Sequence, residues 1–593
     1  MTKQILPLLL TLFFAIQLRG QDSNISERSP AIAVSGHTGW GSQRNHSVNS
    51  TSMVPISGTF TIGGTSPDYA DFTSACTALS SQGVNGPVEF IVRPGTYTEQ
   101  VILDSIAGVS ATNTITFHSL AYDSSTVTLT FASSAAAATN YTLLISGADY
   151  ITFQNLTFQR SGTLAYSTVV EVANESNHVS FLNNRFIGPA GITTANATGT
   201  RSAIFSSTAF SNNDLVIRNN YFKDNANGIW VNGSATQNAT GMIVSDNVFN
   251  NFYAGAFVLY QDAIIVSGNL FTRNSGSATV DYFPVSLRYC TGALLVSKNK
   301  VNSVTGRYGI RLRQCTSTTG SEGIIVNNFV QAGSGATALG QGISLEDNCT
   351  YQRVLHNSVN YCTTSTTSRA LYITGTTTSN IQILNNIFAN TGGGFSMYIN
   401  STATSGILIS NNNCLYTTGS LIGYWGTVSL PTLLNWRTAT GMDANSVGGN
   451  PSFTSASDLH ASAVFLAAAG SSLAGIPDDI DGQLRNLSNP DIGADQFTPV
   501  GISERTVTKQ LSGYPNPVSD KLTLNLPFTM SDQTSMTVYS VSGVVVSAES
   551  ILSSTSGRTL HIDASRLSAG MYFLQLTHDQ VVYSCRFVKT NVE

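Results

Sequence analysis

One short pattern of apolar and polar positions recurs along the middle of the chain, between residues 151 and 414. Each copy has an apolar residue, two variable residues, an asparagine, one more variable residue and a second apolar residue. The copies occupy residues 153–158, 181–186, 217–222, 244–249, 266–271, 296–301, 325–330, 354–359, 383–388 and 409–414. The apolar residues predict inward-facing positions on two short strands, and the asparagine predicts the turn between them.

The spacing of the asparagines predicts how these strands are arranged. The repeated asparagines are Asn184, Asn220, Asn247, Asn269, Asn299, Asn328, Asn357, Asn386 and Asn412, and Leu156 takes their place in the first copy. Their separation varies from 22 to 36 residues, which is typical of a parallel β-solenoid with insertions in its loops. Leucine-rich repeats would need leucines at fixed steps, and propeller blades a longer period. We expect each asparagine to adopt the left-handed bend and its amide to bond the same amide one turn away.

The residues that flank the repeat predict caps for both ends of the solenoid. Residues 66–68 are typical of a helix start, and one apolar helical face follows, made of Phe72, Ala75, Cys76 and Leu79. The segment 479–497 contains several aspartates and Arg485, and we interpret it as the closing segment. Arg485 is expected to pair with Asp481 or Asp491, and a calcium site is the alternative there.

These features resemble the right-handed parallel β-helix proteins, the pectin-lyase-like superfamily, which has an internal asparagine ladder. The resemblance covers about residues 88–497 and rests on the repeat, the entry strands at 88–101 and the closing segment. It implies an all-β fold, a right-handed parallel β-helix with an N-terminal capping helix. It does not imply one activity, because this superfamily includes lyases, glycoside hydrolases, esterases, phage tailspikes and adhesins.

The repeat stops after a short polar stretch at 501–509, and short alternating segments follow that predict a small β-sandwich. Residues 514–517 (YPNP), 538–543, 567–572 and 587–589 together resemble the C-terminal sorting domain of the type IX secretion system of Bacteroidota. The resemblance implies an Ig-like sandwich, the type IX secretion machinery as a partner, and a protein that is secreted or held at the outer cell surface. An ordinary carbohydrate-binding sandwich is the alternative.

The N-terminus is typical of a cleaved secretory signal, because Lys3 precedes the apolar run 5–16 and polar residues follow. No cysteine stands directly after the run, which argues against a lipid anchor. We therefore predict a signal peptide at 1–20, an N-terminal linker at 21–56, the β-helix with its caps at 57–500, a linker at 501–510 and the sorting domain at 511–593. No other apolar run approaches the ~20 residues that a bilayer span needs, so we expect no membrane span in the mature chain.

Composition narrows the classes of partner. Only 10% of the residues are charged and the formal net charge is -5, which argues against coiled coils and against nucleic acid or anionic lipid as partners. The seven cysteines include no C-x-x-C pair, so neither a zinc site nor a dense disulfide scaffold is indicated. Cys290 and Cys315 could form a bridge between adjacent turns, and burial as small apolar residues is the other interpretation.

The strand before each asparagine turn presents two outward columns when the copies are aligned. One column is expected to contain Asn232, Tyr260, Arg288, Arg313, Glu346, Thr374 and Asn400, and its neighbour Trp230, Val258, Ser286, Arg311, Ser344, Tyr372 and Tyr398. The alignment predicts a charged cluster flanked by aromatic rings, made of Arg288, Arg311, Arg313, Glu346 and Asp347. Guanidinium groups suit carboxylates or sulfates, and aromatic faces suit sugar rings.

We interpret this face as a site for an extracellular polysaccharide. The predicted contacts are Trp230, Tyr260, Arg311, Asp347, Tyr372 and Tyr398. A polysaccharide lyase that acts on uronate sugars is the alternative, with Arg288, Arg313 and Glu346 as catalytic residues. In that case Ca²⁺ bound by Glu346 and Asp347 could neutralise the carboxylate of the uronate.

Two plainer interpretations remain open. Arg313 could pair with Glu346 on a solvated ladder, in a purely structural surface protein. His356, beside Asn357, is expected to be a hydrogen-bonded turn residue rather than a base.

Overall fold

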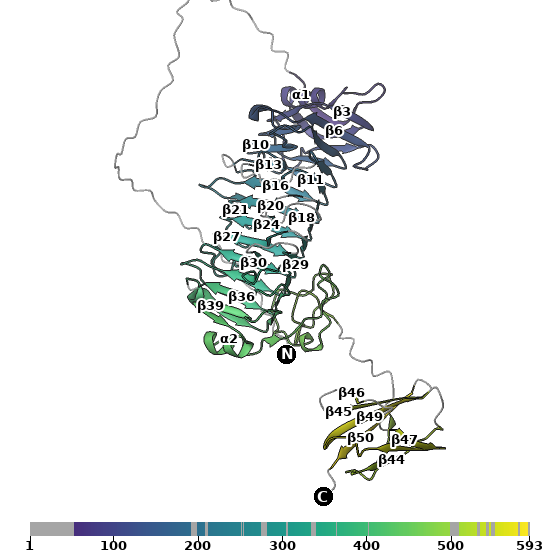
Figure 1. Cartoon of the computed structure of the whole chain (residues 1–593). Helices are drawn as coiled ribbons and strands as arrows, with labels where there is room; N and C mark the ends of the chain where they lie inside the picture. The colour runs from purple at the N-terminus through teal and green to yellow at the C-terminus, as the bar shows by residue number, and fades with distance from the viewer. Residues whose placement is uncertain are drawn as a thin grey trace, which may run out of the picture. The chain divides into compact units, whose positions relative to one another are not determined.

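The described part of the computed structural model is a long parallel β-helix followed by a small β domain (Figure 1). It covers residues 53–190, 199–207, 211–250, 252, 254–273, 282–303, 306–333, 340–362, 364–400, 402–497, 509–529, 534–540, 545–546, 552–578 and 581–590. The predicted signal peptide and most of the predicted N-terminal linker lie outside these residues. Each turn between β2 and β39 contributes one strand to each of three thirteen-stranded sheets, which we name sheets A, B and C.

Sheet A contains the strand that precedes each asparagine turn. Its inward rings stack from turn to turn, with centroids 4.6 Å apart for Phe90 and Phe117 and 5.0 Å apart for Phe117 and Phe153. Its strands are β1 (Ile56–Ile62), β2 (Val84–Val92), β5 (Ile115–Ser119), β8 (Ile151–Gln154), β11 (Ser180–Leu182), β14 (Val216–Arg218), β18 (Ile243–Ser245), β22 (Ile265–Ser267), β25 (Leu295–Ser297), β28 (Gly323–Val326), β31 (Gln352–Leu355), β34 (Ile381–Leu384) and β37 (Ile407–Asn411).

Sheet B contains the strand that follows the asparagine turn, and its inward phenylalanines stack in the same way. Phe186, Phe222, Phe249 and Phe271 are 4.6 to 4.8 Å from one neighbour to the next. The strands are β3 (Gly95–Thr98), β6 (Val127–Ala132), β9 (Thr157–Ser161), β12 (Arg185–Ile187), β15 (Tyr221–Lys223), β19 (Val248–Asn250), β23 (Leu270–Arg273), β26 (Lys300–Ser303), β29 (Phe329–Ala332), β32 (Ser358–Tyr361), β35 (Ile387–Asn390), β38 (Cys414–Thr417) and β41 (Val447–Gly448).

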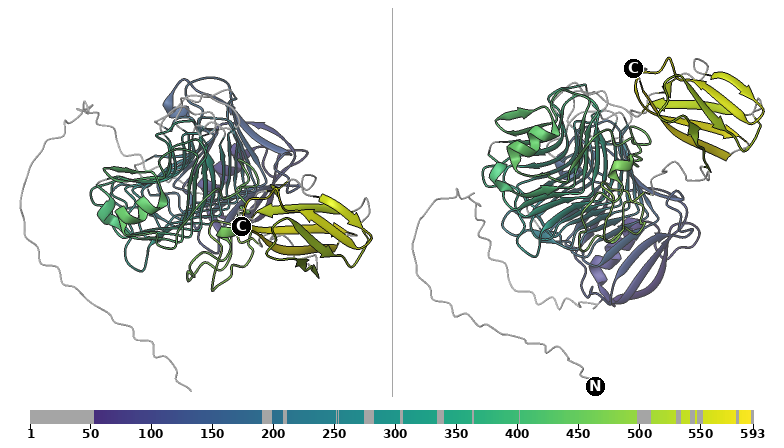
Figure 2. Two further views of the ribbon diagram at one scale, coloured as in Figure 1. Left: turned by 60° about the horizontal axis from the view of Figure 1, so that its bottom comes forward. Right: turned by 90° about the horizontal axis from the view of Figure 1, so that it is seen from below.

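Sheet C completes each turn and has many of the longer strands, up to six residues in the middle turns. Its strands are β4 (Val101–Asp104), β7 (Leu143–Ser146), β10 (Val170–Ala173), β13 (Ser202–Ser206), β16 (Asn227–Asn232), β20 (Ala254–Leu259), β24 (Phe283–Arg288), β27 (Tyr308–Arg313), β30 (Gln341–Glu346), β33 (Arg369–Ile373), β36 (Phe395–Asn400), β39 (Gly423–Gly426) and the antiparallel β40 (Val428–Leu430). The all-β solenoid predicted from the repeat is confirmed, and successive turns lie over one another when seen along the stack (Figure 2).

A buried asparagine ladder joins the turns between sheets A and B, as the repeat predicts. The Nδ2 group of Asn328 donates to Oδ1 of Asn357 at 2.9 Å and to the Val296 carbonyl at 2.9 Å. The ladder ends at Asn413, whose backbone N–H donates to the Ser446 hydroxyl at 2.8 Å. The predicted last member, Asn412, is wrong by one residue, because Asn412 instead donates to the carbonyl of Ala469.

The left-handed bend lies one residue before the ladder and not on the ladder asparagine itself. The bend residues have φ between 48° and 68°, and they are Asn155, Asn183, Asn219, Asp246, Gly268, Lys298, Asn327, His356, Asn385 and Asn412. The two tasks that we assigned to one asparagine are therefore divided between neighbours. The bend residue reverses the chain, and the ladder residue points its amide inward between the strands.

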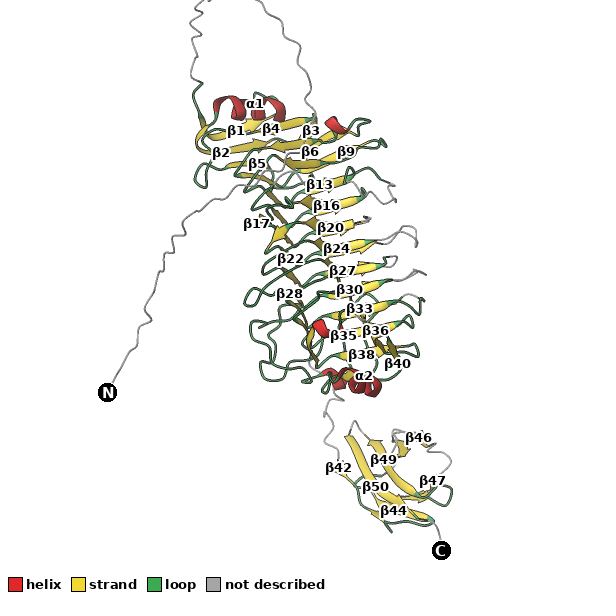
Figure 3. Cartoon of the chain, turned by 90° about the vertical axis from the view of Figure 1, so that its left-hand side faces the viewer, coloured by secondary structure: helices red, strands yellow, loops and turns green. Residues whose placement is uncertain are grey.

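A helix lies at each end of the β-helix (Figure 3). Helix α1 (Phe72–Gln82) buries Phe72, Ala75, Cys76, Ala78 and Leu79 against the first turns. Its N-cap is Asp71, which accepts from the Ser74 N–H at 2.8 Å, so the helix starts three residues later than the predicted start at 66–68. At the far end, α2 (Leu433–Thr440) buries Trp436.

After β41 the chain forms an irregular segment, 451–497, that packs back on the outside of the last turns. Ile480 and Ala494 pack with Phe329 of β29, and Ile492 packs with Ile387 of β35. The only regular elements within it are 3-10 turn η3 (Val464–Leu466) and isolated bridges, as far as the structure describes the segment. Two further short turns, η1 (Ala137–Thr139) and η2 (Thr404–Gly406), and the small sheet of β17 (Ala239–Thr240) and β21 (Gln261–Asp262) lie in loops.

The C-terminal unit has two sheets that share one core. The five-stranded sheet contains β42 (Lys509–Gln510), β50 (Val581–Lys589), β49 (Gly570–His578), β45 (Ser535–Ser540) and β46 (Val545–Val546). The four-stranded sheet contains β43 (Gly513–Tyr514), β44 (Lys521–Asn525), β48 (Thr559–Asp563) and β47 (Leu552–Ser556). Leu522 from one sheet and Leu574 from the other are fully buried in this core. Residues 509 and 510, which the predicted boundaries assign to a linker, pair with β50.

The cysteines are reduced and mostly buried. Cys290, Cys315 and Cys349 follow one another on successive turns, each fully buried, and the Sγ of Cys315 donates to the Leu287 carbonyl. Burial raises the pKa of the Cys315 thiol well above its ordinary value. Of the two interpretations of Cys290 and Cys315, burial as small apolar residues describes this structure.

Candidate functional site

The predicted columns lie on the outer face of sheet C, and not on the strand directly before each asparagine turn, which belongs to sheet A. This face carries the charged cluster, and the predicted columns contain one error in register. Strand pairing aligns Trp230 with Phe257 and Asn232 with Leu259, not with Val258 and Tyr260. Val258 is fully buried in the core. Tyr260 lies in the turn after β20 with φ 55°, and it stacks on Tyr289 with centroids 4.8 Å apart. Tyr260 is therefore not on this face, because the inward residue opposite Ile229 is Ala256 and the apolar Phe257 takes the outward position after it.

The corrected first column has aromatic ends and a polar middle. From turn to turn it contains Phe205, Trp230, Phe257, Ser286, Arg311, Ser344, Tyr372, Tyr398 and Tyr424. Trp230 stacks on Phe257 at 4.1 Å between centroids, and Tyr398 stacks on Tyr424 at the same distance. The column thus offers a ring ladder on each side of Ser286, Arg311 and Ser344.

Two arginines on this face are paired with carboxylates, but neither is paired with the residue directly opposite it in the strand register. Arg311 Nη2 lies 2.5 Å from Glu346 Oε2, and Arg313 Nε lies 2.5 Å from Asp347 Oδ2. The predicted Arg313–Glu346 pair is wrong, although the two residues are opposite each other in the strand register. Asp347 has left the strand with φ 53°, which brings its carboxylate to Arg313 and leaves Glu346 to Arg311 and to the Ser344 hydroxyl.

Arg288 has no carboxylate within ion-pair distance among the described residues. Its guanidinium lies over the Phe257 ring, 4.8 Å from the centroid, and its Nε is buried without a hydrogen bond. Burial lowers the pKa of Arg288, and the charges of Arg311 and Arg313 add to the decrease. An arginine nevertheless stays protonated in this environment. Arg288 is therefore a half-buried positive charge with other positive charges beside it.

Arg369 is a second cation that faces rings rather than carboxylates. Its guanidinium lies 4.4 Å from the Tyr372 centroid and 4.1 Å from the Tyr398 centroid. Strands β24, β27, β30 and β33 together contain four arginines and one glutamate, and Asp347 follows directly. This part of the face is therefore positively charged on balance, in a chain whose formal net charge is -5.

Some residues of this face were missed by the sequence analysis. They are Phe257, Phe283, Tyr308, Arg369 and Tyr424; Phe283 and Tyr308 stack at 4.7 Å, and Arg311 lies over both rings. Phe283, Tyr308 and Arg369 stand at the start of six- and five-residue strands, whereas the alignment used only four positions per turn. An aromatic residue two positions before residues 285 and 310 was the signal that could have identified Phe283 and Tyr308.

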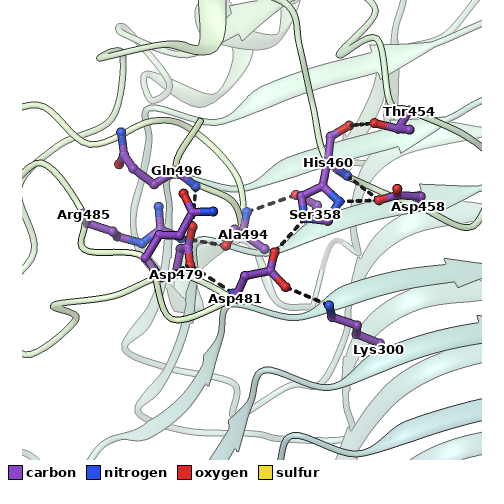
Figure 4. A network of polar contacts seen from close by, with 11 residues as sticks. Lys300, Ser358, Thr454, Asp458, His460, Asp479, Asp481, Arg485, Ala494 and Gln496 are labelled. Atoms are coloured by element: carbon purple, nitrogen blue, oxygen red, sulfur yellow. Dashed lines mark hydrogen bonds and ion pairs between the residues drawn. The ribbon is translucent and has the colours of Figure 1, made fainter. Parts of the chain in front are cut away.

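A second polar cluster lies where the segment 451–497 meets sheet B (Figure 4). His460 lies between two carboxylates, with Nδ1 against Asp458 and Nε2 2.6 Å from Asp481 Oδ2. The other oxygen of Asp481 lies 2.9 Å from Nζ of Lys300 on β26. Burial raises the pKa of Asp495 to about 6, and the nearby Asp479 and Asp481 add to the rise. Among the described residues, ligand atoms of His460, Asp481 and Asp495 lie within 4.8 Å of one another.

Arg485 does not form the predicted ion pair with Asp481 or Asp491. Its Nη2 donates to the side-chain oxygen of Asn327 at 2.7 Å and to the carbonyls of Gly493 and Ala494 at 3.1 and 3.0 Å. Burial lowers the pKa of Arg485 to about 10. Asp491 instead accepts from the backbone N–H groups of Ala468 and Phe497, and Asp481 lies against His460 and Lys300.

His356 is the hydrogen-bonded turn residue that the sequence predicts. Its Nδ1 lies 3.2 Å from the Gly493 carbonyl, and its Nε2 lies 2.8 Å from the Asn385 amide nitrogen. Burial lowers the pKa of His356 well below its ordinary value, and Arg485 contributes to the decrease. These contacts fit a neutral imidazole with the proton on Nδ1.

Family models match two parts of the chain. Residues 512–590 match the secretion system C-terminal sorting domain, and residues 112–271 and 211–375 match the right-handed β-helix region. The match to the right-handed β-helix region agrees with the parallel sheets and indicates that the β-helix is right-handed. No curated protein matches the chain. In the described part, no helix is long and apolar enough to span a membrane.

Solved structures with some likeness include three proteins. Escherichia coli YbhC is 12% identical with a TM-score of 0.26, over 51% of this chain and 73% of its own. A rice weevil pectin methyl esterase is 11% identical with a TM-score of 0.24, over 51% and 79%. The Aspergillus niger pectin methylesterase is 12% identical with a TM-score of 0.22, over 55% and 89%. Scores this low carry no argument about activity.

Proposed function

We propose that this chain, a right-handed β-helix protein that a type IX sorting tail directs to the cell surface or the extracellular space, binds an anionic polysaccharide along the outer face of sheet C. The observation that carries the proposal is Arg288. A half-buried guanidinium without a carboxylate partner among the described residues keeps its full charge for a ligand. Carboxylate and sulfate groups match the guanidinium fork.

The aromatic residues support a sugar polymer rather than a small anion. The rings of Trp230 and Phe257 continue the charged middle of the face in one direction, and those of Tyr372, Tyr398 and Tyr424 continue it in the other. Adjacent turns of a parallel sheet are about 4.8 Å apart. Sugar rings of an extended chain could therefore meet one ring or one guanidinium on each turn.

The binding experiment compares anionic and neutral oligosaccharides by titration calorimetry. We expect uronate-containing or sulfated oligosaccharides to bind, and neutral ones of equal length to bind more weakly. Arg288→Gln should lower the affinity roughly tenfold, because a hydrogen bond to a charged group contributes about 1.5 to 3 kcal/mol. Higher salt should weaken binding in the wild type, because part of the face is solvent-exposed.

Arg218→Gln is the matched control, because Arg218 is an exposed arginine on sheet A and donates to the Ser245 hydroxyl. Binding that is equal in wild type and Arg288→Gln, or equal for anionic and neutral glycans, would contradict the proposal. The same samples report on the alternative function, since a lyase would produce unsaturated sugars that absorb in the ultraviolet. If this absorbance appears with the wild type and is lost in Arg313→Ala and Arg288→Ala, the protein is a lyase that acts by β-elimination and not a binding protein alone.

A further inference from the structure

The cluster between the segment 451–497 and sheet B contains the ingredients of a metal site. We propose that His460 Nε2 and the carboxylates of Asp481 and Asp495 bind one divalent transition-metal ion. This site is independent of the sheet C face, and none of its residues belongs to the polysaccharide proposal. It is assembled from three stretches of the closing segment, which lie against β26 and β29 of the β-helix.

The three ligand atoms are already gathered in one place. They lie within 4.8 Å of one another, and a metal–ligand bond of about 2.0 to 2.2 Å spans such a group with modest movement. His460 Nε2 and Asp481 Oδ2 are 2.6 Å apart, which a shared proton explains. A cation would replace that proton and separate the two atoms slightly.

Asp495 supplies the independent reason for a cation here. This residue is only 6% exposed, and its carboxyl group makes a side-chain hydrogen bond to Asp479. It lies against the carboxylate of Asp479, which is already saturated by the backbone N–H groups of Asp481, Gln483 and Gln496. Two neighbouring carboxylates repel each other when both are ionised, and a bound cation would offset that repulsion.

The surroundings orient the ligands as metal sites require. Asp458 holds Nδ1 of His460, so Nε2 faces Asp481 (Figure 4). A carboxylate that holds the far nitrogen of a histidine ligand is a common outer partner in such sites. Lys300 holds Oδ1 of Asp481 at 2.9 Å and leaves Oδ2 directed to the histidine. The ring of Phe329 packs edge-on to His460 with centroids 4.9 Å apart and restricts its rotation.

The donor set selects the class of metal. One imidazole nitrogen and two carboxylates suit Zn²⁺, Mn²⁺ or Co²⁺, whereas Ca²⁺ and Mg²⁺ prefer oxygen ligands alone. The cluster contains the four carboxylates of Asp458, Asp479, Asp481 and Asp495, which outnumber the two permanent cations near them, Lys300 and Arg485. A divalent ion would therefore reduce the charge imbalance of the cluster.

The test is titration of the full chain with Zn²⁺, with Ca²⁺ and Mg²⁺ as comparison ions. We expect one equivalent of Zn²⁺ to bind, and Co²⁺ to give the visible absorption of a nitrogen- and oxygen-ligated ion. Asp495→Asn and His460→Ala should each weaken Zn²⁺ binding at least tenfold, and Asp458→Asn should weaken it less. If Asp495→Asn fails to fold, Asp481→Asn replaces it, because Asp481 is a more exposed ligand, and this variant should also weaken Zn²⁺ binding.

Asp478→Asn is the matched control. Asp478 belongs to the same segment and pairs with Lys298 at 2.6 Å, outside the ligand group. Its substitution should leave Zn²⁺ binding unchanged. No Zn²⁺ binding by the wild type, equal binding by Asp481→Asn, or a preference for Ca²⁺ would each overturn the proposal.

Discussion

At the scale of single residues, the repeated asparagine owes its position to the number of hydrogen bonds that one amide can make. The amide of Asn328 is fully buried, donates to Val296, Val326 and Asn357, and accepts from Asn299. A side chain of similar size that lacked either a donor or an acceptor would leave buried carbonyl and N–H groups without partners. The ladder therefore stabilises each turn through its neighbours on both sides.

Asn328→Ala tests this account. We expect the free energy of unfolding to fall by about 3 kcal/mol, because several buried polar groups lose their partners at once. Denaturant unfolding followed by circular dichroism measures the change. The exposed Asn445 provides the control, and Asn445→Ala should change stability by less than about 0.5 kcal/mol. Similar losses in both variants would show that the ladder contributes no more than a surface asparagine.

At the scale of elements, the turns depend on backbone conformation as much as on side-chain contacts. The position after each middle strand of sheet C is left-handed in Tyr260, Tyr289, Gln314 and Asp347, with φ from 53° to 56°. None of these residues is a glycine, so each turn holds an L-residue in a conformation that costs about 1 to 2 kcal/mol. The packing of the stacked turns compensates for that cost.

Substitutions at Gln314 measure how much the left-handed conformation of the turn costs in unfolding free energy. A β-branched side chain fits the left-handed region poorly, so Gln314→Val should lower the unfolding free energy by about 1 to 2 kcal/mol. Gln314→Gly should be tolerated, because glycine adopts this φ without a steric cost. Thermal unfolding of the two variants gives their difference directly.

The order of stability of the valine and glycine variants should reverse at Thr152, an outward position in the middle of β8. There valine suits the extended strand and glycine weakens it. The same order of valine and glycine at both positions would mean that side-chain contacts, and not φ, decide stability at Gln314.

At the scale of the whole molecule, the closing segment is joined to the β-helix by buried polar groups. His356, in the bend of one turn, accepts from Asn385 and lies against the Gly493 carbonyl. Arg485 from the same segment reaches Asn327 in the preceding turn. These contacts require an uncharged His356, because burial holds its pKa well below 6.5.

This arrangement predicts a loss of stability in acid. The unfolded chain protonates His356 below about pH 6.5, and the folded chain does so only at a lower pH, so the unfolded state binds more protons in between. Stability should therefore fall with decreasing pH below 6.5, by at most about 1.4 kcal/mol per pH unit from this group.

His356→Asn tests the assignment, because asparagine adopts the φ of 48° and does not titrate. The variant should lose less stability than the wild type between pH 7 and pH 5, as measured by denaturant unfolding at each pH. Parallel curves for the two proteins would exclude His356 as a source of the acid sensitivity.

The solenoid, the buried asparagine ladder and the sorting tail can all be predicted from the amino-acid sequence. These features repeat locally, or form a contiguous set of motifs, so their physical cause lies within a few neighbouring residues. Alternation and the asparagine step are enough to indicate which side chains face inward. Most of the sheet C face followed from the same alternation, including Arg288, Arg311, Arg313 and Glu346.

Features that depend on strand register and on contacts between distant residues become visible only in the folded molecule. The strand register places Phe257 and not Val258 on the face, so Tyr260 lies in the turn, and the bend at Asp347 brings its carboxylate to Arg313 and leaves Glu346 to Arg311. The cluster of His460, Asp481 and Asp495 forms because an irregular segment folds back on sheet B. Such a segment has no period, and its packing decides which of its polar groups meet.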